Sequence, residues 1–123
     1  MRLLVVDDNA MVAAGTAAAL RAGGHRVDVV PTAEAALARH RSGAWDLVLT
    51  DLRLPGLDGW ALVERLRALE PGLPVGVLTG WPAAEGDPGA EERRVCCLLA
   101  KPVEPEELLR TVERVGGRPV AGG

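Results

Sequence analysis

Aromatic residues are almost absent from this sequence. Its 123 residues include no Phe and no Tyr, and the three Trp stand at positions 45, 60 and 81. The hydrophobic core must therefore be built from small aliphatic side chains, chiefly Ala, Val and Leu. Nucleic-acid bases and flavin rings bind proteins largely by stacking on aromatic side chains, so this chain has few residues to offer either ligand.

Long apolar runs, clustered positive charge and spaced cysteines are also missing. No apolar run approaches ~18 residues and no signal peptide is recognisable, so neither a membrane segment nor secretion is expected. The net charge is −3 and the basic residues are scattered, which argues against direct nucleic-acid binding. Cys96 and Cys97 are adjacent, which excludes a metal-binding CxxC motif and would strain a disulfide between them. We expect a reduced, cytoplasmic protein in which one of the two cysteines packs inward.

What the sequence does contain is an alternation of apolar runs and helical patterns, within a length suited to one domain. Strands are expected at residues 3–6, 27–30, 47–50, 75–78 and 95–100, and helices at residues 10–22, 33–41, 59–69 and 105–115. Residues 81–90 carry two Pro and two Gly, so the helix before the last strand is predicted to be short or irregular. The alternation predicts an α/β fold, a doubly wound parallel sheet with helices on both faces. This domain should span residues 1–116, with a flexible tail at 117–123.

Polar residues follow the predicted strands at their carboxyl ends. In parallel sheets with right-handed crossovers these ends share one edge, and ligands bind there. The residues brought to this edge are Asp7, Asp8, Asp51, Thr79 and Lys101. Clustered carboxylates need a compensating charge, and Mg²⁺ suits oxygen ligands while retaining waters that a phosphate can replace. A carboxylate nucleophile beside a metal ion, a hydroxyl and the chain's single lysine predicts a site that accepts a phosphoryl group.

The order and spacing of these residues resemble those of response-regulator receiver domains in two-component signalling. The residues that carry the resemblance are Asp7–Asp8, Asp51-x-x-Leu54-Pro55-x-x-Asp58-Gly59, Thr79 and Lys101–Pro102. The match spans essentially the whole chain, and the stretches around Thr79 and Lys101 are closest in style to receivers of hybrid histidine kinases. The resemblance implies a flavodoxin-like sheet of strand order 2-1-3-4-5, with a histidine kinase or a histidine phosphotransfer domain as partner.

The resemblance also implies a role for each residue of the site. Asp51 would be the phosphoacceptor, taking its phosphoryl group from a phosphohistidine of the partner. The ligands of a Mg²⁺ or Mn²⁺ ion would be Asp7, Asp8, Asp51 and the backbone carbonyl of Arg53. Thr79 and Lys101 would bind the phosphoryl oxygens. The domain would catalyse only its own phosphorylation and dephosphorylation, and would not be a separate enzyme.

Further residues are implicated in docking and in signalling by the same resemblance. The residues expected to meet a partner's helix are Val12, Gly15, Pro102 and Val103, with a cis bond before Pro102. The residues expected to modulate the site are Arg53, Gly80, Trp81 and Leu98. Leu98 stands three residues before the lysine, where many receivers carry Tyr or Phe to report phosphorylation. With Leu at this position and an irregular segment at 81–90, we expect a domain that carries phosphate but signals weakly, as a relay or phosphate sink would.

Two other families remain open from the residues alone. An aspartyl phosphatase of the haloacid dehalogenase type needs Asp-x-Asp after the first strand, where this chain has Asp7–Asp8–Asn9. A flavodoxin-like FMN binder needs a phosphate loop of Ser, Thr and Gly at that point, and two aspartates there would repel phosphate unless a metal ion were bound. A receiver is therefore the leading interpretation, either free-standing or the C-terminal part of a hybrid histidine kinase.

Overall fold

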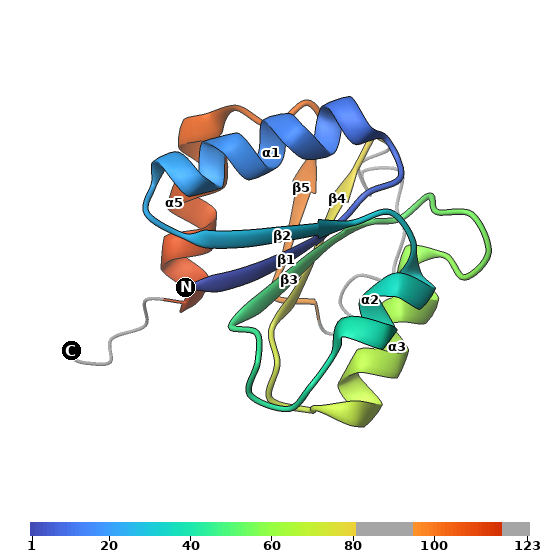
Figure 1. Ribbon diagram of the computed structural model, residues 1–123. Coiled ribbons are helices and arrows are strands. Elements are labelled where there is room, and N and C mark those ends of the chain that lie inside the picture. The colour runs from blue at the N-terminus through green and yellow to red at the C-terminus, as the bar shows by residue number, and fades with distance from the viewer. Residues whose placement is uncertain (81–94, 117–123) are drawn as a thin grey trace.

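The computed structural model describes residues 1–80 and 95–116. Within them strands and helices alternate as predicted, and Figure 1 shows the strands in the middle of the molecule with helices on either side. The strands are β1 (Arg2–Val6), β2 (Arg26–Val30), β3 (Leu47–Asp51), β4 (Val75–Thr79) and β5 (Cys97–Ala100). The helices are α1 (Ala10–Ala22), α2 (Ala33–Arg39), α3 (Gly59–Leu69) and α5 (Pro105–Gly116). The irregular segment predicted at 81–90 and the tail predicted at 117–123 lie outside the described residues.

The five strands form one parallel sheet of order β2-β1-β3-β4-β5. This confirms both the predicted fold class and the strand order that the resemblance implied. The winding direction changes between β1 and β3, and their carboxyl ends therefore border the crevice where sheets of this kind bind ligands. Helices α1 and α5 cover one face of the sheet, and α2 and α3 cover the other (Figure 1).

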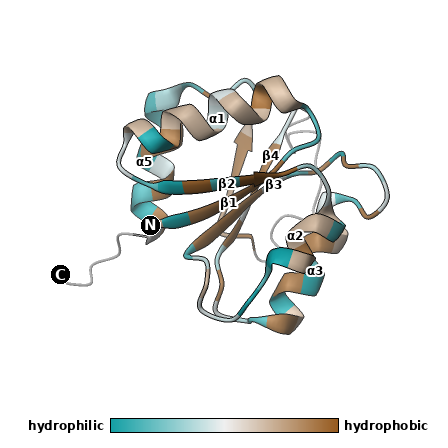
Figure 2. Ribbon diagram, in the orientation of Figure 1, coloured by the Kyte–Doolittle hydropathy of each residue, from teal (hydrophilic) through white to brown (hydrophobic). Residues whose placement is uncertain are grey.

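Aliphatic side chains fill the space between the sheet and its helices. The central strands β1 and β3 are covered on both faces, so Leu3–Val6 and Leu47–Leu49 are fully buried. Successive side chains point to opposite faces, with Leu4 packing toward α2 and α3 and Leu3 packing toward α1 and α5. Figure 2 shows the result, strongly apolar strands between helices of mixed character. Burying each such side chain contributes about 1.5–3 kcal/mol, so this core holds the strands in register without any Phe or Tyr.

Polar caps set where three of the helices begin. Asn9, Thr32 and Asp58 precede α1, α2 and α3, and each accepts a hydrogen bond from a backbone N–H of the first turn. Asp58 is recognisable as a cap from the sequence itself, because it is a short polar residue directly before the helical pattern at 59–69. Two boundaries differ from expectation by two residues, since α2 ends at Arg39 and β5 begins at Cys97, and five other boundaries differ by one residue. No helix among the described residues is long and apolar enough to cross a membrane.

Candidate functional site

The register of the sheet sets the predicted site residues side by side. The last residue of β1 pairs with the residue before Asp51, so Asp7 lies next to Asp51 at the carboxyl edge. Thr79 ends β4 and is buried, and its carbonyl oxygen accepts a hydrogen bond of 2.7 Å from the N–H of Lys101. The ends of β1, β3, β4 and β5 therefore contribute to a single site. Their convergence was predicted from the alternation of strands and helices alone.

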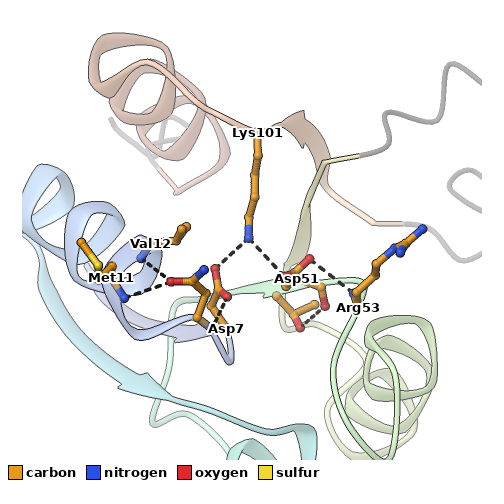
Figure 3. Close-up of polar contacts among 8 residues, drawn as sticks. Asp7, Met11, Val12, Asp51, Arg53 and Lys101 are labelled. Atoms are coloured by element: carbon orange, nitrogen blue, oxygen red, sulfur yellow. Dashed lines mark hydrogen bonds and ion pairs between the residues drawn. The ribbon is translucent and has the colours of Figure 1, made fainter.

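Lys101 crosses this site and contacts two carboxylates (Figure 3). Its Nζ donates a hydrogen bond of 2.8 Å to Asp7 Oδ2 and one of 3.1 Å to Asp51 Oδ2. Burial alone lowers the pKa of this ammonium group, but the hydrogen bonds and negative charges of the two aspartates outweigh burial, and the pKa is raised. Lys101 is therefore held as a cation beside Asp51, where it can bind an anion.

Three carboxylates lie together at this edge. One oxygen each from Asp7, Asp8 and Asp51 lie within 4.8 Å of one another. Asp7 is 2% exposed, Asp8 is exposed and Asp51 is intermediate. One lysine does not balance three carboxylates, and carboxylate oxygens at this spacing suit a hard divalent cation. In residues 1–80 and 95–116 no other group of three or more acidic, His or Cys side chains lies close enough to hold a metal ion.

Backbone N–H groups hold the two buried or half-buried aspartates. The N–H of Asn9 donates to Asp7 Oδ1 at 2.9 Å, and the N–H of Arg53 donates to Asp51 Oδ1 at 3.3 Å. Each carboxylate thus receives a backbone hydrogen bond on one oxygen and the lysine on the other. Neither N–H was identified from the sequence. In each pair the N–H belongs to the residue two positions after the aspartate. This spacing is the signal that the sequence offers, because short Asp side chains commonly accept a hydrogen bond from the backbone N–H two residues further on.

Gly59 brings the first turn of α3 against the end of β3. Its N–H donates to the carbonyl oxygen of Leu52 at 2.9 Å. A Cβ at position 59 would overlap the carbonyl oxygen of Asp51 and would lie 2.7 Å from the Cα of Leu52. These neighbours are backbone atoms and cannot rotate away, so only glycine permits this approach. Gly59 was recognised in the sequence only as part of a motif, and this contact was not predicted.

The predicted docking residues line one hollow beside the site. This hollow has a volume of about 490 Å³ and lies between α1 and the segment that joins β5 to α5. The predicted residues that line it are Val12, Gly15, Pro102 and Val103, together with Lys101 of the site. Met11, which also lines the hollow, is 85% exposed. The Lys101–Pro102 peptide bond is cis.

The predicted modulators are more dispersed. Arg53 is exposed two residues after Asp51, and Gly80 is exposed directly after β4. Leu98 is half-buried on β5 and packs against the core that faces α2 and α3. Trp81 lies outside the described residues.

The fold and the site together define a class of protein, a doubly wound α/β domain with an aspartate cluster and a lysine at its carboxyl edge. Comparison with family models then assigns it, because residues 3–113 match the response regulator receiver domain. The chain belongs to this family of two-component signalling domains, whose members are phosphoacceptors. Membership decides against the haloacid dehalogenase and flavodoxin alternatives.

Curated relatives agree with this assignment. A response regulator receiver protein of Anaeromyxobacter sp. strain Fw109-5 is 36% identical over 88% of this chain and 45% of its own length. The transcriptional regulatory protein ZraR of Salmonella typhimurium is 32% identical over 91% of this chain and 25% of its own length. The chain thus spans about a quarter to a half of these relatives. Since ZraR is named a transcriptional regulator, the closeness to hybrid-kinase receivers stays a prediction.

Solved structures give the same result. The non-phosphorylated HemR receiver domain of Leptospira biflexa superposes with a TM-score of 0.87 and 30% identity, covering 99% of this chain and 98% of that one. A CheY-like receiver domain protein of Methanospirillum hungatei superposes with a TM-score of 0.84 and 29% identity, covering 92% and 90% of the two chains. Residues 1–80 and 95–116 therefore adopt the receiver fold.

Proposed function

We propose that this domain accepts a phosphoryl group from a phosphohistidine onto Asp51, in a reaction that depends on Mg²⁺ or Mn²⁺. The observation that carries the proposal is the position of Lys101 Nζ, within hydrogen-bond distance of both Asp7 and Asp51. An ammonium group in this position can bind an oxygen of the incoming phosphoryl group while the Asp51 carboxylate attacks phosphorus. This role goes beyond family membership, since it names the nucleophile.

In the proposed reaction the oxygen of Asp51 forms a bond to phosphorus as the bond between phosphorus and the imidazole nitrogen breaks. The released imidazole takes up a proton and leaves as neutral histidine. Lys101 and the hydroxyl of Thr79 would bind the transferred phosphoryl oxygens. The N–H of Arg53 keeps Asp51 oriented through its other oxygen, Oδ1. Hydrolysis of the resulting acyl phosphate by water would return the domain to its starting state without a separate enzyme.

The residues fit a divalent cation at this site. The proposed ligands are the carboxylates of Asp7, Asp8 and Asp51 and the backbone carbonyl of Arg53. Mg²⁺ suits this oxygen-only set and keeps several waters in its coordination shell. When bound, the ion would supply positive charge that offsets the carboxylates and the phosphoryl oxygens.

Intact-mass spectrometry tests the proposal directly. With Mg²⁺ and acetyl phosphate, the chain should gain one phosphoryl group that acid hydrolysis releases, and Asp51→Asn should gain none. Asp28→Asn is the matched control, because Asp28 lies exposed on β2 and pairs only with Arg39 among the contacts described for it. An unchanged mass in the wild type at saturating phosphodonor would overturn the proposal.

The partner would be a histidine kinase or a histidine phosphotransfer domain that docks on the hollow beside α1. Support comes from its lining, since Val12, Gly15, Pro102 and Val103 surround an apolar depression that reaches Lys101. A phosphohistidine on a partner's helix can approach Asp51 from this side. Gly15→Arg should slow transfer from a phosphorylated partner at least tenfold while sparing acetyl phosphate labelling, because no atom lies within 4 Å of a Cβ at position 15. Equal slowing of both reactions would show that Gly15→Arg disturbs the phosphoacceptor site and not partner docking.

Signalling by phosphorylation would be weak in this domain. A ligand shifts a two-state equilibrium only by its differential affinity for the two states. Leu98 offers no aromatic ring that could swing inward when Thr79 binds the phosphoryl group. The phosphorylated and unphosphorylated states would therefore differ little. Arg53, Gly80 and Trp81 would then act mainly on how long the phosphoryl group survives. These features fit a phosphate relay or sink better than a strong switch.

A further inference from the structure

A second group of reactive side chains lies at the opposite edge of the sheet, where β5 begins. Cys96 directly precedes the strand and its N–H donates to the carbonyl oxygen of Val75 at 2.9 Å, while Cys97 is the first strand residue. Both thiols are free, and Cys96 is exposed while Cys97 packs partly against the core that faces α1 and α5. At about 3.3 Å per residue, β5 separates Cys97 from Lys101 by about 13 Å, so this pair is distinct from the phosphoacceptor site.

The two sulfur atoms face one another. The thiol of Cys96 donates to Cys97 Sγ, with 3.7 Å between the sulfurs. Gly76 of β4 pairs with Cys97 in the sheet, and a Cβ at position 76 would lie 2.5 Å from Cys97 Sγ and 3.5 Å from Cys96 Sγ. The missing side chain of Gly76 therefore leaves the room that the sulfur of Cys97 occupies, with the sulfur of Cys96 in contact beside it.

Their separation suits a bridging atom better than a disulfide. A disulfide needs the sulfurs to approach to about 2.05 Å, and its Cα atoms usually lie about 4.4–6.8 Å apart, whereas adjacent Cα atoms are about 3.8 Å apart. An atom bonded to both sulfurs holds them about 3.3–3.8 Å apart, for bonds of about 2.3 Å and bond angles between about 90° and the tetrahedral value. The observed 3.7 Å lies in this range, so a bridging atom requires less movement of the two sulfurs than a disulfide does.

The pair is also prepared to lose a proton. The hydrogen bond donated by Cys96 lowers the pKa of Cys97, and the charge of Arg114 on α5 lowers it further against the opposing effect of burial. The same hydrogen bond raises the pKa of Cys96, because its proton is the one shared between the sulfurs. Cys97 is therefore the first of the two to become a thiolate, which is the form that binds soft centres.

The chemistry of the pair selects its ligand. Thiolates prefer soft centres, and a closed tetrahedral metal site needs four ligands. No third His, Cys, Asp or Glu of the described residues joins the two sulfurs in such a site. Trivalent arsenic needs only two sulfurs from the protein, because its third bond goes to carbon or to oxygen. We propose that Cys96 and Cys97 form a dithiol site that binds a trivalent arsenical through both sulfurs.

The binding step is a condensation without change of oxidation state. With phenylarsine oxide as ligand, two S–H bonds and the arsenic–oxygen bond break, and two As–S bonds form. The oxygen leaves with both thiol protons as one molecule of water. Arsenic stays trivalent throughout and no oxidant is required.

Intact-mass spectrometry of the reduced full chain with phenylarsine oxide tests the site. The wild type should carry one phenylarsenic group per chain, and the adduct should persist in excess 2-mercaptoethanol because two bonds must break to release it. Dithiothreitol, a competing dithiol, should remove it. Cys96→Ser and Cys97→Ser each leave one sulfur, so each should retain at least tenfold less adduct in the monothiol.

Two controls keep the outcome decisive. Acetyl phosphate labelling of Asp51 should be unchanged in Cys96→Ser, which reports that the fold is intact, since Cys96 is exposed. If Cys97→Ser fails to fold, the Cys96 variant alone decides. An adduct in that variant that resists the monothiol as well as the wild type does would overturn the proposal, as would the absence of a wild-type adduct.

Discussion

The two edges of one sheet carry opposite chemistry. The carboxyl edge holds the charged residues Asp7, Asp8, Asp51 and Lys101, which lie at the ends of three different strands. The atoms that could bind a metal ion there are carboxylate oxygens. The amino end of β5 holds two polarizable sulfurs from adjacent residues. The first site exists only when β1, β3 and β5 are in register, whereas the second comes from two adjacent residues and requires only that β4 lies beside β5. Disturbing the packing should therefore harm the carboxyl edge far more than the cysteine pair.

Gly59→Ala should give the largest effect. The new Cβ meets the backbone of Asp51 and Leu52, so the end of β3 or the start of α3 must move. We expect a loss of about 3 kcal/mol in the free energy of unfolding and a marked fall in acetyl phosphate labelling. Chemical denaturation and intact mass measure the two quantities.

Gly15→Ala is the matched control for this change. It also adds one methyl group to a helix, but nothing lies within 4 Å of it, and it should stabilise the protein by about 0.5–1 kcal/mol. Equal stabilities of the two variants would show that close packing at position 59 is unimportant. Retention of arsenical binding by Gly59→Ala would sharpen the contrast between the edges.

Lys101→Ala should come next. It removes the ammonium group that contacts Asp7 and Asp51, leaving three neighbouring carboxylates uncompensated. Labelling by acetyl phosphate should slow about 100-fold, in the range found for loss of one charge-stabilising donor. Arg110→Ala, which removes an exposed cation from α5, should leave the rate unchanged. A Lys101 variant that is labelled at the wild-type rate would contradict the role assigned to this ammonium.

Mg²⁺ should stabilise the folded chain by a smaller amount. At a concentration ten times its dissociation constant, a ligand that binds only the folded state adds about 1.4 kcal/mol. Thermal unfolding with and without EDTA measures this gain. Asp8→Asn should lose most of it, and Asp28→Asn should keep it. Stabilisation that survives Asp8→Asn would show that the ion binds elsewhere.

The smallest effect concerns communication between the edges. Beryllofluoride with Mg²⁺ should shift amide NMR signals around Asp51, Thr79 and Lys101, because it mimics a bound phosphoryl group there. Signals at the start of β5 and along α5 should change little, since Leu98 provides no aromatic reporter. Large shifts at Cys97 or along α5, or dimerisation through them, would show that the two edges are coupled after all.

Much of this arrangement is predictable from the sequence. Short apolar runs mark the strands, Asp58 marks the start of α3, and the alternation of elements implies a parallel sheet. The parallel sheet in turn implies that Asp7, Asp51, Thr79 and Lys101 meet at one edge. These inferences succeed because hydrophobic periodicity and capping depend on near neighbours in the chain. The boundaries were less certain, and β5 proved to be two residues shorter than expected.

Tertiary packing decided the rest. Asp7 and Asp8 are identical neighbours in sequence, yet Asp7 is buried and accepts a hydrogen bond from Lys101, whereas Asp8 is exposed. The sulfurs of Cys96 and Cys97 meet over Gly76 only because β5 starts between them and β4 lies alongside. Local sequence determines which residues form each element. The distances between groups on different elements follow from how the core brings those elements together, and no short stretch of the chain contains that information.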